Sequence, residues 1–263
     1  MLSRIRSLST AVMSGRNQQL TFDDTVGSWE RAQQVATGYD SSKIVNRVAT
    51  ATRAVLEGSA AFERDGVSFD EPDYRWPVAA GMLRSAARHG ELRVIDFGGS
   101  LGSLYWQHKE LFSGLSVTWT VVEQPAFVQA AEQMALAPLE FTTDLSAALS
   151  ATKPHIAVVS SVLQYLEEPW QLVTTLSKSS VDSMIIDRTP MWSGAFDIPT
   201  VQEVPRHIYP GSYPAWILSS PRMTDAFRQW HTVARFPGIE PALKTRSGRA
   251  FTWSGFIAER TSP

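Results

Sequence analysis

The sequence predicts an α/β fold, in which a mostly parallel, seven-stranded sheet with an antiparallel edge strand follows an N-terminal helical extension. From about Leu92 onward, short apolar runs alternate with segments of helical pattern. That alternation is typical of parallel strands joined by helices that cover both faces of a sheet. The last two apolar runs, His231–Phe236 and Arg249–Arg260, are separated only by a loop rich in Gly, Pro and basic residues. They are expected to pair antiparallel at the far edge of the sheet.

Composition limits the class of protein. The 263 residues, 43% of them hydrophobic, are enough for one large domain with an extension. The net charge of −2 provides no basic field for nucleic acid, and the absence of cysteine excludes disulfides and thiolate metal sites. No apolar run approaches the roughly 20 residues that span a bilayer. We expect a cytoplasmic protein with no metal site, with a homodimer as one possible assembly.

The first 20 residues form a basic segment that we expect to be flexible. They contain three arginines, four serines and no acid, and several apolar residues fall near helical spacing. Three interpretations stay open: a packed N-terminal helix, an organelle-targeting segment, or an amphipathic helix that contacts an anionic membrane surface weakly.

Residues 21–90 are predicted to form a helical cap. Its clearest helices are Ser28–Val35 and Ser42–Leu56. The stretch Phe62–Trp76 is aromatic and rich in turn residues, and Val78–His89 is expected to be a helix that leads into the first strand.

Residues 91–263 are predicted to form the main domain. Its expected strands are Leu92–Phe97, Val117–Glu123, Leu139–Thr142, His155–Ser160 and Ser183–Asp187. The helices expected between them are Ser103–Phe112, Pro125–Ala135, Leu145–Ala151 and Pro169–Ser179. Pro125 and Pro169 suit the first turn of a helix, where the N–H that proline lacks would have no partner.

Polar residues recur where each expected parallel strand ends. In an open parallel sheet, ligands bind at the carboxyl ends of the strands, at the point where the strand order reverses. The residues expected at that edge are Asp96–Gly102, Glu123, Thr143–Asp144, Ser160–Tyr165 and Asp187–Pro190.

The most informative of these is the turn after the first strand. Asp96 is followed by Gly98, Gly99, Ser100 and Gly102 in the pattern Asp-x-Gly-x-Ser-x-Gly. Glycines there let backbone N–H groups approach a ligand closely. A dinucleotide motif has five positions from its first to its last glycine and no acid before it, whereas Gly98 and Gly102 are four apart.

A carboxylate ends the next strand. Glu123, followed by Gln124, lies 27 residues after Asp96. An acid in this position can accept both hydroxyls of a ribose, as in dinucleotide sites. Glu123 therefore predicts a nucleoside ligand without choosing between cofactors.

Several short sequence motifs are more specific than the fold class alone. They are GYD (38–40), ERDGVSF (63–69), DFGGSLGS (96–103), VVEQP (121–125), SSVLQYLEEP (160–169), DRTP (187–190), VPRHIYPGSYPAW (204–216) and WSGF (253–256). Over roughly residues 28–256 the chain resembles a family of methyltransferases encoded among bacterial surface-polysaccharide and sugar-modifying functions. The resemblance implies the class I methyltransferase fold, which is Rossmann-like, and S-adenosyl-L-methionine as cofactor. It does not specify the substrate, for which we expect a small-molecule or glycan acceptor.

The resemblance also implies roles for the residues at the strand ends. Those implied for the cofactor are Asp96, Gly98, Gly99, Ser100, Gly102, Glu123, Gln124, Asp144, Leu145, Ser160 and Ser161. Ser100 departs from the glycine usual in the family's first motif. Asp144 has two open interpretations, a contact with the adenine amino group or the N-cap of a helix. Those implied for the acceptor are Gln164, Tyr165, Arg188 and Tyr213, although Asp187 and Arg188 suit a salt bridge at a turn equally well.

Methyl transfer to a hydroxyl benefits from a base close to its proton. The candidates are Asp187, His207 and Tyr209. His207 and Tyr209 lie in the segment 204–216, whose three prolines and aromatic residues predict an irregular stretch that closes over the acceptor.

Two other functions are weighed against methyl transfer. A nicotinamide-dependent oxidoreductase is disfavoured by the turn spacing. The Tyr-x-x-x-Lys pair of Tyr39 and Lys43 lies upstream of the main domain and is therefore misplaced for that chemistry. A catalytically inactive, cofactor-binding partner subunit stays open because of Ser100.

Overall fold

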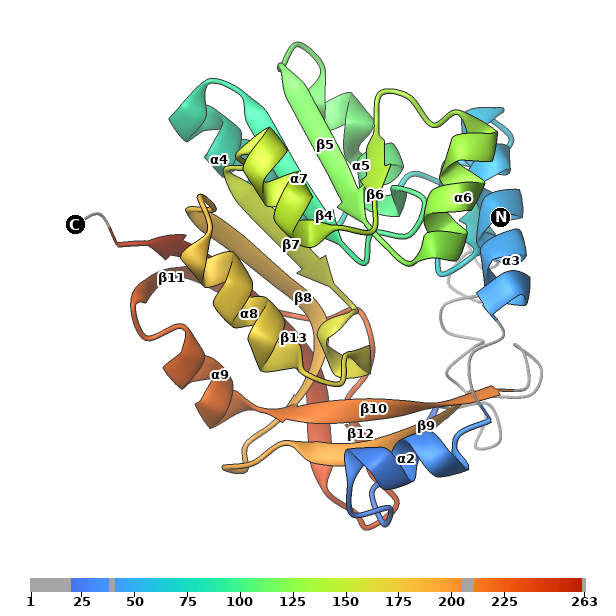
Figure 1. Cartoon of the computed structure of the whole chain (residues 1–263), viewed down its shortest axis with the longest axis vertical. Helices are drawn as coiled ribbons and strands as arrows, with labels where there is room; N and C mark the ends of the chain where they lie inside the picture. The colour runs from blue at the N-terminus through green and yellow to red at the C-terminus, as the bar shows by residue number, and fades with distance from the viewer. Residues whose placement is uncertain (1–19, 38–40, 205–210, 262–263) are drawn as a thin grey trace.

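The computed structural model of the chain describes residues 20–37, 41–204 and 211–261 (Figure 1). His207, Tyr209 and the basic segment 1–19 lie outside the described residues. Within the described part, no helix is both long and apolar enough to cross a membrane.

Five parallel strands form the centre of the sheet. In spatial order they are β6 (Glu140–Thr142), β5 (Val117–Val122), β4 (Leu92–Phe97), β7 (Ile156–Ser160) and β8 (Ser183–Trp192). The chain starts at β4, proceeds outward through β5 to β6, and then crosses to β7 and β8 on the other side of β4. The strand order thus reverses between β4 and β7, where an open α/β sheet leaves its ligand crevice.

The antiparallel strand is internal, which corrects the prediction of an antiparallel edge. β13 (Ala250–Arg260) pairs antiparallel with β8 on one side and with β11 (Trp230–Pro237) on the other. Phe256, Ile257 and Ala258 of β13 are all buried. A strand whose residues are buried on both faces belongs inside a sheet, and the less buried β11 forms the edge.

Over the described residues the sheet has eleven strands, where seven were predicted. β9 (Ile198–Val204) and β10 (Gly211–Ser219) form an antiparallel pair that joins the sheet where β10 meets the end of β8. β1 (Thr21–Asp23) extends this pair, and the short β12 (Leu243–Lys244) pairs with β13. Figure 1 shows β9 and β10 reaching away from the central strands. The described part of the segment 204–216 is therefore strand, where an irregular stretch was expected.

Helices cover both faces of the central sheet. One face is packed by α3 (Ser41–Leu56), α4 (Trp76–His89), α5 (Ser103–His108) and α6 (Pro125–Met134), and the other by α7 (Leu145–Thr152), α8 (Pro169–Lys178) and α9 (Ser220–Ala226). Val94 contacts the first group and its neighbour Ile95 the second, because successive strand residues point to opposite faces. Pro125 and Pro169 lie in the first turn of their helices, as predicted.

The region before β4 contains strands as well as helices. α2 (Trp29–Val35), α3 and α4 match three expected helices. The hairpin of β2 (Phe62–Arg64) and β3 (Val67–Phe69) turns at Asp65 and Gly66, both of which have positive φ. β1 belongs to the main sheet, and buried residues of α3 and α4 share a core cluster with β4. The helical cap predicted for residues 21–90 therefore also contains three short strands, β1, β2 and β3, that were not predicted.

We expect Gly81→Ala to lower the free energy of unfolding, although alanine normally favours a helix over glycine by about 1 kcal/mol. A Cβ on Gly81 would lie 2.7 Å from Ile185 Cδ1, so α4 would have to move off β8 at a loss of about 1–3 kcal/mol. Urea unfolding measures the change in the free energy of unfolding. Ala80→Gly, on the exposed side of the same helix, is the control, because it changes only the helix propensity. Stabilisation by Gly81→Ala would contradict the close packing.

Candidate functional site

The turn after β4 holds three residues in the left-handed region of backbone conformation. Gly98, Ser100 and Gly102 have φ of 72°, 57° and 82°. A Cβ on Gly98 would lie 2.5 Å from Val162 Cγ2, and one on Gly102 would overlap Leu139. Glycine is therefore required at both positions. Ser100 adopts the conformation that glycine favours, at a cost of about 1–2 kcal/mol, so its departure from the family's glycine leaves the path of the turn intact.

Asp96 lies beneath this turn and is only 1% exposed. Its Oδ2 accepts a hydrogen bond from Trp119 Nε1 at 3.2 Å, while its Oδ1 has no hydrogen-bond partner among the described residues. A Cβ on Gly99 would overlap the carboxylate. Burial raises the pKa of Asp96 to about 7. The residue is thus a buried acceptor below the turn.

Glu123 connects the ends of β4 and β5. Its Oε1 accepts from the backbone N–H of Ser100 at 3.3 Å, and its Oε2 accepts from that of Gln124 at 2.6 Å. The carboxyl is half-buried, and burial raises its pKa. Gln124 is exposed at the start of α6. The glycine turn and the acid predicted beside it are therefore brought together.

Asp144 is the N-cap of α7. Its Oδ1 accepts from the backbone N–H of Ala147 at 2.9 Å, and its side chain is exposed at the end of β6. This is one of the two interpretations left open for the residue, and a contact with adenine stays a prediction. Leu145, the first residue of the helix, is half-buried.

The end of β7 contributes a second buried acceptor without a partner. Ser161 has a φ of 58°, and its hydroxyl accepts from Gln164 Nε2 at 3.2 Å. Gln164 is 2% exposed, and its Oε1 has no hydrogen-bond partner in the described chain. β4 and β7 are neighbours, and Gly98 approaches Val162 closely. Asp96 Oδ1 and Gln164 Oε1 therefore flank the reversal point from either side.

Asp187 does not suit the role of base. It is fully buried, and its carboxylate accepts from Arg75 Nη2 at 2.7 Å, from Arg75 Nε at 3.2 Å and from Ser160 Oγ at 3.2 Å. Its oxygens are already occupied by these donors, and within the described chain no side of the carboxylate is open to a methyl acceptor. The alternative interpretation, a salt bridge between Asp187 and Arg188, is also wrong, because Asp187 pairs with a residue 112 positions away.

Arg188 instead pairs with two acids from distant parts of the chain. Its Nη2 contacts Asp65 Oδ2 at 2.8 Å, and its Nε contacts Glu240 Oε1 at 2.6 Å. Arg188 itself has a φ of 48°. Two carboxylates neutralise the guanidinium, so Arg188 is fixed at the end of β8 as a group held in an ion-pair network.

Two of the residues predicted to bind the methyl acceptor lie next to each other beside this network. The rings of Tyr165 and Tyr213 pack edge to face with centroids 6.3 Å apart. The Tyr165 hydroxyl donates to Gln202 Oε1 at 3.0 Å, and Asp65 and Arg188 both act electrostatically on it. Tyr165 is 40% exposed, whereas Tyr213 is buried. Tyr165 is thus the residue of this pair available to a ligand.

Sequence reasoning missed five residues of the site: Glu63, Asp65, Arg75, Gln202 and Glu240. Glu63 is buried, accepts from Ser103 Oγ and from Gly66 N, and so ties the β2–β3 hairpin to the start of α5. The turn signal at Asp65 was visible in the sequence, but nothing local indicated its arginine partner. Over the described residues, no group of three or more His, Cys, Asp or Glu is placed to hold a metal ion.

No family model matches the chain, and no curated protein does. Solved structures are similar in fold. The N-terminal domain of EvdMO1, crystallised in the presence of SAH and D-fucose, is 14% identical over 85% of this chain and 98% of its own, with a TM-score of 0.48. A 1,6-didemethyltoxoflavin-N1-methyltransferase from Burkholderia thailandensis is 13% identical over 86% and 92%, with a TM-score of 0.40.

A third structure is an S-adenosylmethionine-dependent methyltransferase from Clostridium acetobutylicum ATCC 824. It is 7% identical over 82% of this chain and 99% of its own, with a TM-score of 0.44. At identities of 14% or less and TM-scores below 0.5, nothing about ligand or substrate is transferred from these three proteins.

The buried carboxyl of Asp96 predicts a pH dependence of stability. Its folded pKa is raised to about 7, so the folded state holds a proton that the unfolded state has lost. The free energy of unfolding should therefore fall as the pH rises from about 4, the pKa of an unfolded aspartate, to about 7, the folded pKa of Asp96. Asp96→Asn removes this contribution and should flatten the profile, with the exposed Asp70→Asn as control. Glu63, whose pKa is also raised to about 7, should leave a residual slope. Urea unfolding across this pH range measures the free energy of unfolding of each protein. Parallel pH profiles for wild type and Asp96→Asn would contradict a raised pKa of Asp96.

Proposed function

We propose that the chain is an S-adenosyl-L-methionine-dependent methyltransferase whose cofactor lies in the crevice between the carboxyl ends of β4 and β7. The observation that carries the proposal is the contact of the Glu123 carboxylate with the Ser100 N–H. It fixes an acid that suits a ribose diol against a turn where glycine is required.

The electrostatics of the crevice favour this cofactor over a dinucleotide. Asp96 Oδ1 and Gln164 Oε1 are acceptors without partners, and Glu123 adds a carboxylate. S-adenosyl-L-methionine has an ammonium group that can donate to such acceptors and a positively charged sulfonium. The pyrophosphate of NAD offers only acceptor oxygens and negative charge, which the Glu123 carboxylate would repel and to which the Gln164 oxygen could not hydrogen-bond. The residues present therefore fit the first cofactor and oppose the second.

When bound, the cofactor supplies a methyl group on a sulfonium, open to in-line attack. The chain's own residues have to align the acceptor and exclude water, since charge disperses in the transition state. Tyr165 presents an exposed ring and a hydroxyl at the acceptor side, next to the Arg188 network. Asp187 instead holds Arg75 and Ser160, a positioning role at the end of β8. His207 and Tyr209 remain proposed bases.

We propose a sugar, glycan or related small polar metabolite as the acceptor. The groups that would meet it are the Tyr165 hydroxyl and the ion-paired Asp65 and Arg188, all of which can exchange hydrogen bonds with hydroxyl groups. Such acceptors are polar and uncharged over much of their surface, which suits an arginine whose charge is already compensated.

Incubation with the cofactor and a panel of nucleotide sugars, glycans and small polar metabolites tests the proposal. We expect one class of acceptor to gain the mass of about one methylene per molecule, and Glu123→Gln to lose this activity. Binding of S-adenosylhomocysteine without transfer to any acceptor would favour an inactive partner subunit. Nicotinamide-dependent oxidation of a panel member would favour the oxidoreductase.

A further inference from the structure

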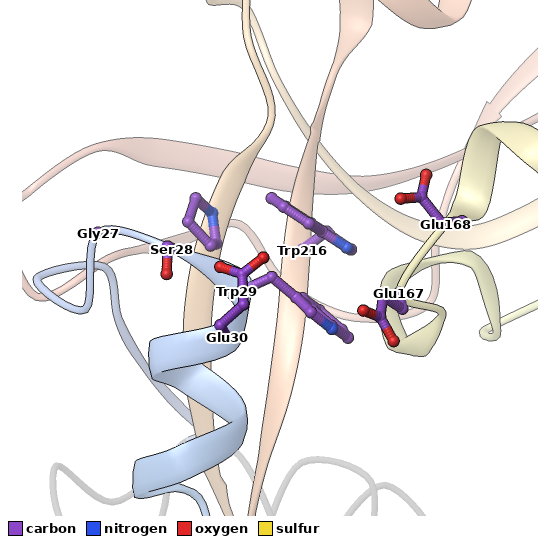
Figure 2. Close-up of a pocket in the computed structure, with 8 residues that line it drawn as sticks. Gly27, Ser28, Trp29, Glu30, Glu167, Glu168 and Trp216 are labelled. Atoms are coloured by element: carbon purple, nitrogen blue, oxygen red, sulfur yellow. The ribbon is translucent and has the colours of Figure 1, made fainter.

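A second hollow lies on the outer side of the β9–β10 pair. Its volume is about 410 Å³, and it is lined from three directions, by the start of α2, by the connection into α8 and by β9 and β10 (Figure 2). Trp216 faces it from β10, whereas Tyr213 faces the acceptor side. The two residues are three apart on one strand and so point to opposite faces. The hollow is therefore separate from the proposed catalytic crevice.

Two tryptophans form its floor. The rings of Trp29 and Trp216 are stacked, with centroids 5.0 Å apart and planes at 8°. Trp216 Nε1 donates to the backbone oxygen of Leu166 at 3.0 Å, which fixes its ring. Trp29 is 5% exposed, and its Nε1 has no hydrogen-bond partner among the described residues. Figure 2 shows the nitrogen-bearing edge of Trp29 directed toward the side of the hollow where Glu167 lies. An indole N–H in this position calls for an acceptor.

The rim is acidic. Glu30, Glu167 and Glu168 line the hollow, and its described lining includes no lysine or arginine. A hydrogen bond from the Ser28 hydroxyl lowers the pKa of Glu30, which keeps that carboxylate ionised. Three carboxylates around an aromatic floor favour a cation, and the floor adds a face that attracts both cations and C–H groups.

We propose that this hollow binds a hydroxylated primary amine of the amino-sugar class, at a site separate from methyl transfer. An ammonium group alone satisfies the carboxylates but offers nothing to the Trp29 N–H, because it has no acceptor. A neutral polyol offers acceptors but leaves the acidic rim uncompensated. An amine that also bears hydroxyl groups satisfies both, and its C–H face packs against Trp216.

Titration calorimetry of the full chain at neutral pH with D-glucosamine tests the proposal. We expect saturable binding, with D-glucose, which lacks the ammonium, and cyclohexylamine, which lacks the hydroxyls, each weaker by about tenfold or more. Glucose binding as tightly as glucosamine would overturn the role of the rim, and cyclohexylamine binding as tightly would overturn the role of the indole. The absence of saturable heat with glucosamine would overturn the site.

Matched variants separate this site from the catalytic crevice. The Glu167→Gln, Glu168→Gln double variant should weaken glucosamine about tenfold, and Trp29→Phe, which keeps a ring without the N–H, should weaken it several-fold. Glu132→Gln, an exposed acid on α6, should have no effect. Affinity for S-adenosylhomocysteine should be unchanged in all of them, which verifies folding. Unchanged glucosamine affinity in the double variant would contradict the proposal whatever the outcome of the methyl-transfer experiments.

Discussion

Replacing Glu123 with alanine is expected to weaken binding of S-adenosylhomocysteine by about 10- to 100-fold. Hydrogen bonds to a charged group contribute about 1.5–3 kcal/mol, and about 1.4 kcal/mol corresponds to tenfold in affinity. The variant also removes the Glu123 oxygen that accepts a hydrogen bond from the Ser100 N–H at 3.3 Å. The turn therefore loses this hydrogen bond together with the contact to the ligand.

Calorimetric dissociation constants for wild type and variant measure this effect. Glu132→Ala is the matched control, because it removes an exposed acid from the helix that follows Glu123. It should leave the dissociation constant unchanged. Equal constants for Glu123→Ala and wild type would mean that the cofactor does not contact this acid.

Arg75→Met should lower the free energy of unfolding by about 3–5 kcal/mol, because it leaves the buried carboxylate of Asp187 without its counterion. The pair is protected from water, with side chains 12% and 0% exposed. The methionine keeps the aliphatic bulk that packs near Phe236, over which the guanidinium now lies at 5.2 Å. The loss would therefore report the unpaired charge.

The control is an ion pair at the opposite end of the sheet. Arg84 contacts Glu259 at 2.7 Å with its own side chain 51% exposed. Because the buried Glu259 keeps a second partner, Arg88 at 3.3 Å, Arg84→Met should change stability by less than about 1 kcal/mol. The double variant Arg75→Met, Asp187→Leu should recover much of the loss. Urea unfolding measures all three, and equal effects of Arg75→Met and Arg84→Met would contradict a buried structural role for Asp187.

The parts of the fold that local sequence determines were predicted well. β4 has the expected bounds, Leu92–Phe97, because an apolar run ends there in an acid and a glycine turn. Pro125 and Pro169 marked the starts of two helices. Both signals depend only on neighbouring residues, so they are visible without knowledge of the fold.

Pairing between distant strands could not be predicted in the same way. Pro199 and Pro214 interrupt the strand pattern of β9 and β10, yet both lie in strands of the sheet. The internal position of β13 depends on which strands flank it, and its nearly continuous burial is a property of the sheet. The antiparallel pair of β11 and β13 at the far edge was predicted correctly, whereas the strand that runs antiparallel to the central strands is the inner member of that pair and not the edge strand.

The same distinction between local and long-range contacts applies to the candidate site. The glycine turn and Glu123 were found from spacing, and the structure brings them together. The partners of Asp187 and Arg188 were not found, because Arg75, Asp65 and Glu240 come from remote segments. A salt bridge between the adjacent residues Asp187 and Arg188 was one of two interpretations, but each of them pairs with its own distant counterion.

Side-by-side titration with S-adenosylhomocysteine and NAD tests the central claim most directly. An acidic crevice with two buried acceptors and no partner for them should bind the first in a saturable, one-to-one manner. It should give no saturable signal with NAD under the same conditions. Saturable binding of NAD, with none of S-adenosylhomocysteine, would contradict the assignment of the crevice.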